Sequence, residues 1–104
     1  MKIKIEQLDI PAEKITEYLL VVKLKTDKSK FLFSLGYTKE NWQELLHDII
    51  EIALNNDLVL QGISEFGNLY SIDGKLKNRK VITIWLQQLN NDRYRFITLY
   101  PKKL

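Results

Sequence analysis

The C-terminal segment 79–101 constrains the fold most, because it holds two strand-like runs on either side of an Asn-Asn pair. Residues 81–86 and 94–100 alternate along the chain and are rich in β-branched and aromatic side chains. Asparagine tolerates the positive φ that a two-residue hairpin turn requires. The segment therefore predicts two antiparallel strands that meet at Asn90 and Asn91.

This turn also fixes which residues share a face, since successive side chains of a strand point to opposite sides. One face then pairs Thr83 with Thr98, Trp85 with Phe96 and Val81 with Tyr100. The other face pairs Ile82 with Leu99 and Ile84 with Ile97, and we expect this aliphatic face to meet the core. The face with threonines and aromatics is expected to stay open, although a shift of one residue would exchange the two faces.

Helical patterns precede this hairpin. Residues 10–20, 28–35 and 39–55 have apolar side chains at helical spacing, and Pro11, Gly36 and Thr38 are typical of helix ends. The longest of these helices has a broad apolar stripe, made of Trp42, Leu45, Leu46, Ile49, Ile50, Ala53 and Leu54.

Further strands are expected at 2–6, 58–66 and 69–73, with turns at Gly67-Asn68 and Asp73-Gly74 and a bulge at Gly62. The 104 residues have no linker or repeat, so we expect one domain over 1–104. The predicted fold class is α+β, with N-terminal helices packed on one face of a four-stranded antiparallel sheet (a meander) and the other face open.

Several kinds of chemistry are disfavoured by composition. The chain has no cysteine and one histidine, His47, which is expected on the polar side of helix 39–55. Metal sites built from His or Cys are therefore excluded, and no phosphate-binding glycine loop is present, so we expect no metal and no cofactor. No apolar run is long enough to cross a membrane, and no signal peptide is seen, so a cytoplasmic protein is expected.

Charge is unevenly distributed along the chain. Residues 1–38 carry a net charge of +2, residues 39–73 carry −6, and residues 74–104 carry +7. The pattern suggests an anionic partner for the C-terminal strands and a basic partner for helix 39–55, although solvated surfaces give the same pattern.

RNA is the anionic partner that best fits the expected open face. Bases stack on aromatic side chains, which on this face are Trp85, Phe96 and Tyr100, and Tyr70 is a further candidate for RNA binding. Phosphates are bound by cations, here Arg79, Lys80 and Arg95. An alternative reading is that these aromatics belong to the core, where cross-strand aromatic and Thr–Thr pairs stabilise a sheet without any further role.

Several short motifs follow one another along the chain. They are Ile-Thr-Glu-Tyr-Leu-Leu at 15–20, Lys28-Ser-Lys-Phe, Ser34-Leu-Gly-Tyr37, Asn41-Trp42, Phe66-Gly67 with Tyr70, Thr83-Ile-Trp85, and Thr98-Leu-Tyr-Pro101. Their order resembles a bacterial domain family of unknown function that is common in cyanobacteria. It also resembles the C-terminal RNase toxin domains of contact-dependent inhibition and polymorphic toxins, which have the barnase–EndoU–colicin–RelE fold.

The resemblance implies a toxin-like ribonuclease that cleaves RNA, with tRNA as one candidate, without a metal and alongside a cognate antitoxin or immunity protein. It implies that Lys28 stabilises the charged phosphate, that Thr83 and Thr98 hold phosphate oxygens, and that Tyr100 or Tyr70 donates a proton. The chain departs from the toxin pattern at Ile82, where arginine is usual, and its loop at 74–79 is short. A non-catalytic nucleic-acid-binding module and a protein-interaction module therefore stay open as alternatives.

Overall fold

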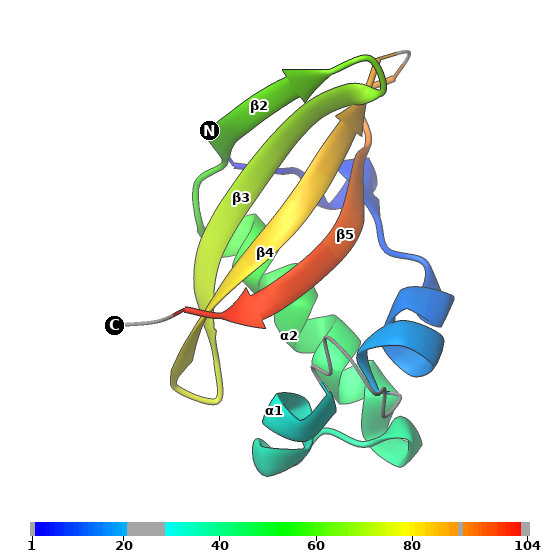
Figure 1. Cartoon of the computed structure of the whole chain (residues 1–104), viewed down its shortest axis with the longest axis vertical. Coiled ribbons are helices and arrows are strands. Elements are labelled where there is room, and N and C mark those ends of the chain that lie inside the picture. The colour runs from blue at the N-terminus through cyan, green and yellow to red at the C-terminus, as the bar shows by residue number, and fades with distance from the viewer. Residues whose placement is uncertain (1, 21–28, 90, 103–104) are drawn as a thin grey trace.

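The computed structural model describes residues 2–20, 29–89 and 91–102, and these form an α+β domain. A five-stranded mixed sheet has the strand order β1-β5-β4-β3-β2, and helices lie behind it in the view of Figure 1. The strands are β1 (Leu8–Asp9), β2 (Val59–Ser64), β3 (Gly67–Leu76), β4 (Arg79–Gln88) and β5 (Tyr94–Pro101).

The helical layer covers one face of this sheet. Its longest member is α2 (Trp42–Asn55), preceded by the 3-10 turn η3 (Lys39–Asn41), so the helix predicted at 39–55 is confirmed. Leu45, Ile49 and Ala53 of the predicted apolar stripe are buried, and so is Ile52, which the prediction did not include. The remaining helical segments are η1 (Ile5–Gln7), η2 (Lys14–Leu19), which has π-helical bonding, and α1 (Ser29–Ser34).

The N-terminal edge of the sheet differs from the prediction. Residues 2–6 form no strand, and β1 instead pairs in parallel with Tyr94 and Arg95 of β5. The sheet is therefore mixed and five-stranded, and the four-stranded antiparallel sheet was wrong in this respect. A two-residue strand is too short to leave an alternating pattern in the sequence, and this is why it was missed.

Two of the predicted turns lie elsewhere. The β3–β4 turn is at Lys77 and Asn78, whose φ angles are 50° and 70°, so Asp73 and Gly74 lie inside β3. Strands β2 and β3 are joined at 65–66, and Gly67 begins β3. The bulge predicted at Gly62 is confirmed by a register shift between Leu60 and Gly62.

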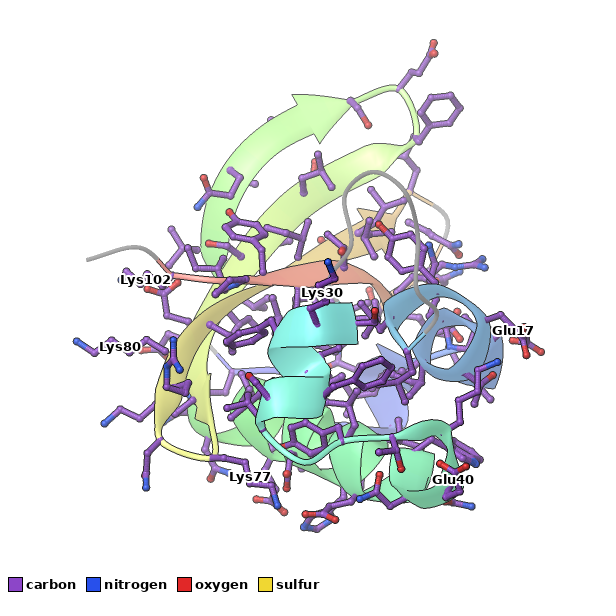
Figure 2. All side chains as sticks on the ribbon, turned by 60° about the horizontal axis from the view of Figure 1, so that its bottom comes forward. Glu17, Lys30, Glu40, Lys77, Lys80 and Lys102 are labelled. Carbon is purple, nitrogen blue, oxygen red and sulfur yellow. The ribbon has the colours of Figure 1, made fainter. Side chains whose placement is uncertain are left out.

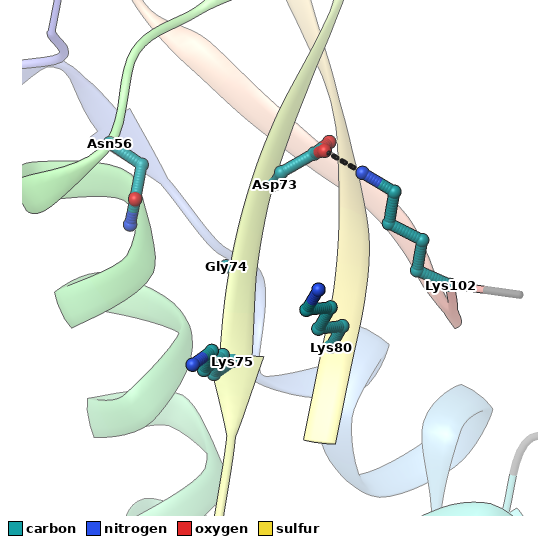
Figure 3. Close-up of a pocket in the computed structure, with 6 residues that line it drawn as sticks. All are labelled: Asn56, Asp73, Gly74, Lys75, Lys80 and Lys102. Carbon is teal, nitrogen blue, oxygen red and sulfur yellow. Dashed lines mark hydrogen bonds and ion pairs between the residues drawn. The ribbon is translucent and has the colours of Figure 1, made fainter. Parts of the chain in front are cut away.

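Gly74 marks the closest approach of α2 to the sheet. A Cβ atom at this position would lie 2.6 Å from Cγ2 of Ile52, which leaves no room for a side chain. Helix α2 can therefore pack directly against the middle of β3, and its C-terminal end comes close to Asp73 and Lys75 on the same strand (Figure 3).

The predicted register of β4 and β5 was correct at one pair only. Trp85 lies opposite Phe96, but an irregularity at Ile84–Trp85 shifts every pair beyond it. Four pairs differ from the prediction, and the observed ones are Ile84–Thr98, Thr83–Leu99, Ile82–Tyr100 and Val81–Pro101. The shift arises because Ile97 is an extra residue on β5, a bulge that the sequence pattern did not indicate.

The predicted core face was also wrong. Val81, Thr83, Trp85 and Phe96 are completely buried beneath the helices, whereas Ile82 and Ile84 are half-buried on the other face. Both faces of β4 are apolar at their centre, so alternation alone could not decide which one is covered. The larger side chains bury more area, and this favours the face with Trp85.

Thr83 and Trp85 form a polar contact inside this core. The Trp85 Nε1–H donates to Thr83 Oγ1 at 2.8 Å, and the Thr83 hydroxyl donates to the Ile72 carbonyl at 2.9 Å. The Trp85 and Phe96 rings meet edge to face with centroids 5.3 Å apart. The threonine hydroxyl thus satisfies the indole N–H, which would otherwise be buried without an acceptor.

Candidate nucleic-acid interface

The face of the sheet turned away from the helices is arranged in rows across β3, β4 and β5. Lys75 lies opposite Lys80 in the first row, and in the next row Ile82 lies between Asp73 and Tyr100. A third row contains Ser71, Ile84 and Thr98. This surface, the open face, is therefore aliphatic along its centre and polar at its margins.

Lysines gather at one end of the open face. A cavity of about 410 Å³ lies there, lined by Asn56, Asp73, Gly74, Lys75, Lys80 and Lys102. We call Lys75, Lys80 and Lys102 the lysine cluster. Figure 2 places Lys80 and Lys102 on one side of the molecule and Glu17 and Glu40 on the other.

The backbone fixes this cluster in place. The Lys102 N–H donates to the Lys80 carbonyl at 2.9 Å, which holds the chain end beside β4. The Lys102 Nζ donates to Asp73 Oδ2 at 2.7 Å, with both side chains about half exposed (Figure 3). Among the described residues, Lys75 and Lys80 have no ion-pair partner.

This charge balance suits an anion. Three lysines and one aspartate line the cavity, so its side chains carry a net positive charge at neutral pH. Lysine side chains bind phosphate oxygens as mobile point charges with three N–H donors each. The cavity is therefore suited chemically to a phosphate group, and the adjoining rows offer the Tyr100 and Thr98 hydroxyls.

Four of the residues predicted for RNA lie on the open face. Thr98 and Tyr100 follow each other along β5, and Tyr100 is 40% exposed. Lys80 belongs to the lysine cluster, and the exposed Arg95 lies opposite Leu86 in the fourth row. The structure thus brings Lys80 and Tyr100 to one end of the sheet and leaves Arg95 at the other.

The other predicted residues lie on the helix-covered face or outside the described chain. Thr83, Trp85 and Phe96 are in the core, so the expectation that they face RNA was wrong. Tyr70 is half-buried against Tyr94, with ring centroids 5.7 Å apart. The Arg79 guanidinium lies 5.7 Å from the centre of the Phe31 ring. Lys28 lies outside the described residues.

The acidic surface of α2 is partly neutralised by the chain itself. Lys77 in the β3–β4 turn pairs with Glu44, and this hydrogen bond raises the pKa of Lys77. The Lys77 ammonium also lies 5.2 Å from the centre of the buried Tyr37 ring. Tyr37 donates to Asp48 at 2.5 Å, and burial together with this bond raises the Tyr37 pKa well above its usual value.

Two further observations concern what the described residues do not contain. They include no cluster of three or more His, Asp or Glu side chains that could hold a metal ion. Within the same residues, no helix has the length and apolar character needed to span a membrane. His47 lies exposed on α2, with its Nε2 atom 3.8 Å from Glu51.

Comparison with known proteins identifies the family. The profile described as "Domain of unknown function (DUF6883)" matches residues 2–103, so the chain belongs to this family. No match was found among the curated proteins or among the solved structures.

Sequence reasoning missed part of the lysine cluster. Lys75 and Lys102 belong to the basic segment 74–104, but nothing in their spacing shows that they meet at one cavity. Asp73 was placed in a turn, and only the true turn at Lys77 and Asn78 puts it on a strand of the open face. The available signal for this turn was Asn78, which tolerates a positive φ, but the Asp73-Gly74 pair is a more usual turn sequence and was chosen instead.

Proposed function

We propose that this chain binds single-stranded RNA on the open face and cleaves it without a metal ion, in the manner of a toxin-like ribonuclease. The observation that carries the proposal is the lysine cluster, which lies one row from Tyr100 and Asp73. RNA supplies both the phosphate for these lysines and the 2′-hydroxyl that makes its own backbone cleavable.

In this proposal, Lys80 and Lys102 hold the scissile phosphate and stabilise the charge that develops on it. The ribose 2′-oxygen attacks the adjacent phosphorus and its proton passes to the Asp73 carboxylate. The bond from phosphorus to the 5′-oxygen breaks, and the Tyr100 hydroxyl protonates that oxygen. The products are a 2′,3′-cyclic phosphate and a 5′-hydroxyl, so atoms and charge balance without an added reactant.

Each role is supported by position. Asp73 already accepts a hydrogen bond from Lys102, which holds a carboxylate beside the phosphate site. Tyr100 is opposite Ile82, and Ile82 is opposite Asp73, so the two proton-transferring groups flank one strand of the open face. The Tyr100 hydroxyl is a hydrogen-bond donor, so it can deliver a proton to a neighbouring oxygen. Thr98 lies in the next row, where its hydroxyl donates to the Leu99 carbonyl at 3.4 Å, and the family resemblance gives it the role of holding a phosphate oxygen.

A non-catalytic RNA-binding module on the same face is the second candidate. The observation that favours it is the position of Thr83, whose hydroxyl is used by Trp85 and Ile72 in the core and is out of reach of a phosphate on the open face. A cognate antitoxin or immunity protein remains part of the proposal only if the chain cleaves RNA.

A cleavage assay distinguishes the ribonuclease from the non-catalytic RNA-binding module. The pure chain is incubated with total tRNA in EDTA, alongside Tyr100→Phe and Asp73→Asn, with Lys39→Gln as the matched control. Lys39 is exposed at the start of η3 and is next to Glu40, which Figure 2 places far from Lys80. Fragments ending in 2′,3′-cyclic phosphate that are lost in both site variants and retained in the control support the ribonuclease. RNA that stays intact but bound supports the binding module, and RNA that does not bind at low salt overturns both.

A further inference from the structure

Strand β2 leaves one edge of the sheet apolar and unpaired. It stands last in the strand order, and among the described residues no strand lies beyond it. Leu60 and Ile63 on this strand are 53% and 78% exposed, and Phe66 in the following turn is 70% exposed. An exposed apolar edge of this kind is a surface on which another strand can pair.

The opposite edge is protected in ways that β2 is not. There, the two-residue β1 covers the start of β5, and β5 itself carries Arg95 and Pro101. Very short edge strands, charged side chains and proline are the usual means of preventing edge pairing. Strand β2 contains no lysine, arginine or proline, and its one irregularity is the bulge.

The bulge makes the edge self-complementary. Leu60 lies opposite Tyr70 and Ile63 lies opposite Asn68, two residues apart on β3, so both point to the same face of the sheet. In a strand without a bulge they would point to opposite faces, because they are three positions apart and side chains alternate. The extra residue at Gln61 brings them to the same face. An antiparallel partner that places its own Ile63 opposite Leu60 thus brings four aliphatic side chains together on one face.

We infer that the partner is a second copy of this chain, paired antiparallel through β2 about a two-fold axis. Symmetric pairing is the commonest form of self-association, and it uses the same patch on both copies. The resulting sheet is continuous across the two copies. The open face stays uncovered in each, so this inference does not depend on the proposed function.

The area and charge of the edge set the strength of this dimer. Leu60, Ile63 and Phe66 of two copies would bury roughly 500 Å² of apolar surface, which is below the ~1,200 Å² of a stable interface. The dimer is therefore weak and depends on concentration. Strand β2 itself carries no charged side chain, so the dimer should persist when salt screens charges.

Sedimentation equilibrium of the full chain tests the inference, from ~10 μM to ~1 mM protein in ~50 mM and ~500 mM NaCl. Ile63→Lys places a charge in the centre of the edge, and Ile5→Lys is the matched control. Ile5 is 64% exposed and lies in η1, away from β2. Circular dichroism checks that each variant is folded, and Leu60→Lys replaces Ile63→Lys if the latter is not.

The expected result is a mass that rises with concentration toward twice that of the monomer at both salt concentrations. The folded edge variant should remain monomeric at every concentration, and Ile5→Lys should behave as the unsubstituted chain does. A monomer throughout, or a dimer that persists in the edge variant, overturns the inference. A dimer that salt dissociates also overturns it, because the contact would then depend on opposite charges.

Discussion

Replacing Thr83 by valine tests whether this hydroxyl serves the core or a ligand. Valine keeps the branched shape and removes the oxygen that accepts from Trp85 and donates to Ile72. Leaving the buried indole N–H unpaired and losing the bond to Ile72 cost about 3 kcal/mol together. The methyl group that replaces the hydroxyl regains at most ~0.8 kcal/mol, so Thr83→Val should lose about 2 kcal/mol of stability.

Thr83→Ser is the matched control, since it keeps the hydroxyl and removes one methyl group at a cost of about 1 kcal/mol. Thermal denaturation followed by tryptophan fluorescence measures both variants, and the Tm of Thr83→Val should fall by roughly 8–16 °C. If Thr83→Val is as stable as Thr83→Ser, the core hydrogen bonds are not stabilising. If that stable variant no longer cleaves RNA, the Thr83 hydroxyl takes part in cleavage.

Two further predictions concern the packing and titration of the fold. Gly74→Ala should lower the free energy of unfolding by about 1–3 kcal/mol, because the new Cβ would meet Ile52. Gly62→Ala is the control, since the space around Gly62 is open and the stability should change little. Urea denaturation of both variants measures the difference. The raised pKa of Tyr37 means that the folded state retains a proton that the unfolded state releases near its ordinary pKa of 10.0. Stability is then complete below about pH 10 and is lost as the pH rises above it. Tyr37→Phe should flatten this alkaline loss in denaturation measured from ~pH 9 to ~pH 11, and an equal loss in both proteins would refute the assignment.

The sequence predicted the fold correctly where a residue pattern was compatible with only one local structure. Helix 39–55 has a single apolar stripe, so its position and its buried residues Leu45, Ile49 and Ala53 were correct. Trp85 opposite Phe96 was also correct, as was the bulge at Gly62. These features depend on local spacing, which alternation and helical periodicity encode directly.

The candidate site was harder to predict, because it depends on which face of β4 the helices cover. Ile82 and Ile84 are as apolar as Val81 and Trp85, so both faces suit a core and only packing volume decides between them. The bulge at Ile97 then moved Tyr100 from its expected partner Val81 to Ile82, on the open face. Lys102 joined the cavity through a bond to the Lys80 backbone, a contact that no sequence spacing encodes.

The central claim is that RNA binds on the open face, and NMR titration tests it most directly. A short single-stranded RNA is added to the isotope-labelled chain at low salt, and the amide shifts of every assigned residue are followed. The account predicts changes at Asp73, Lys75, Lys80, Tyr100 and Lys102 that disappear as salt rises. Changes confined to α2 or to β2, or none at low salt, would contradict it.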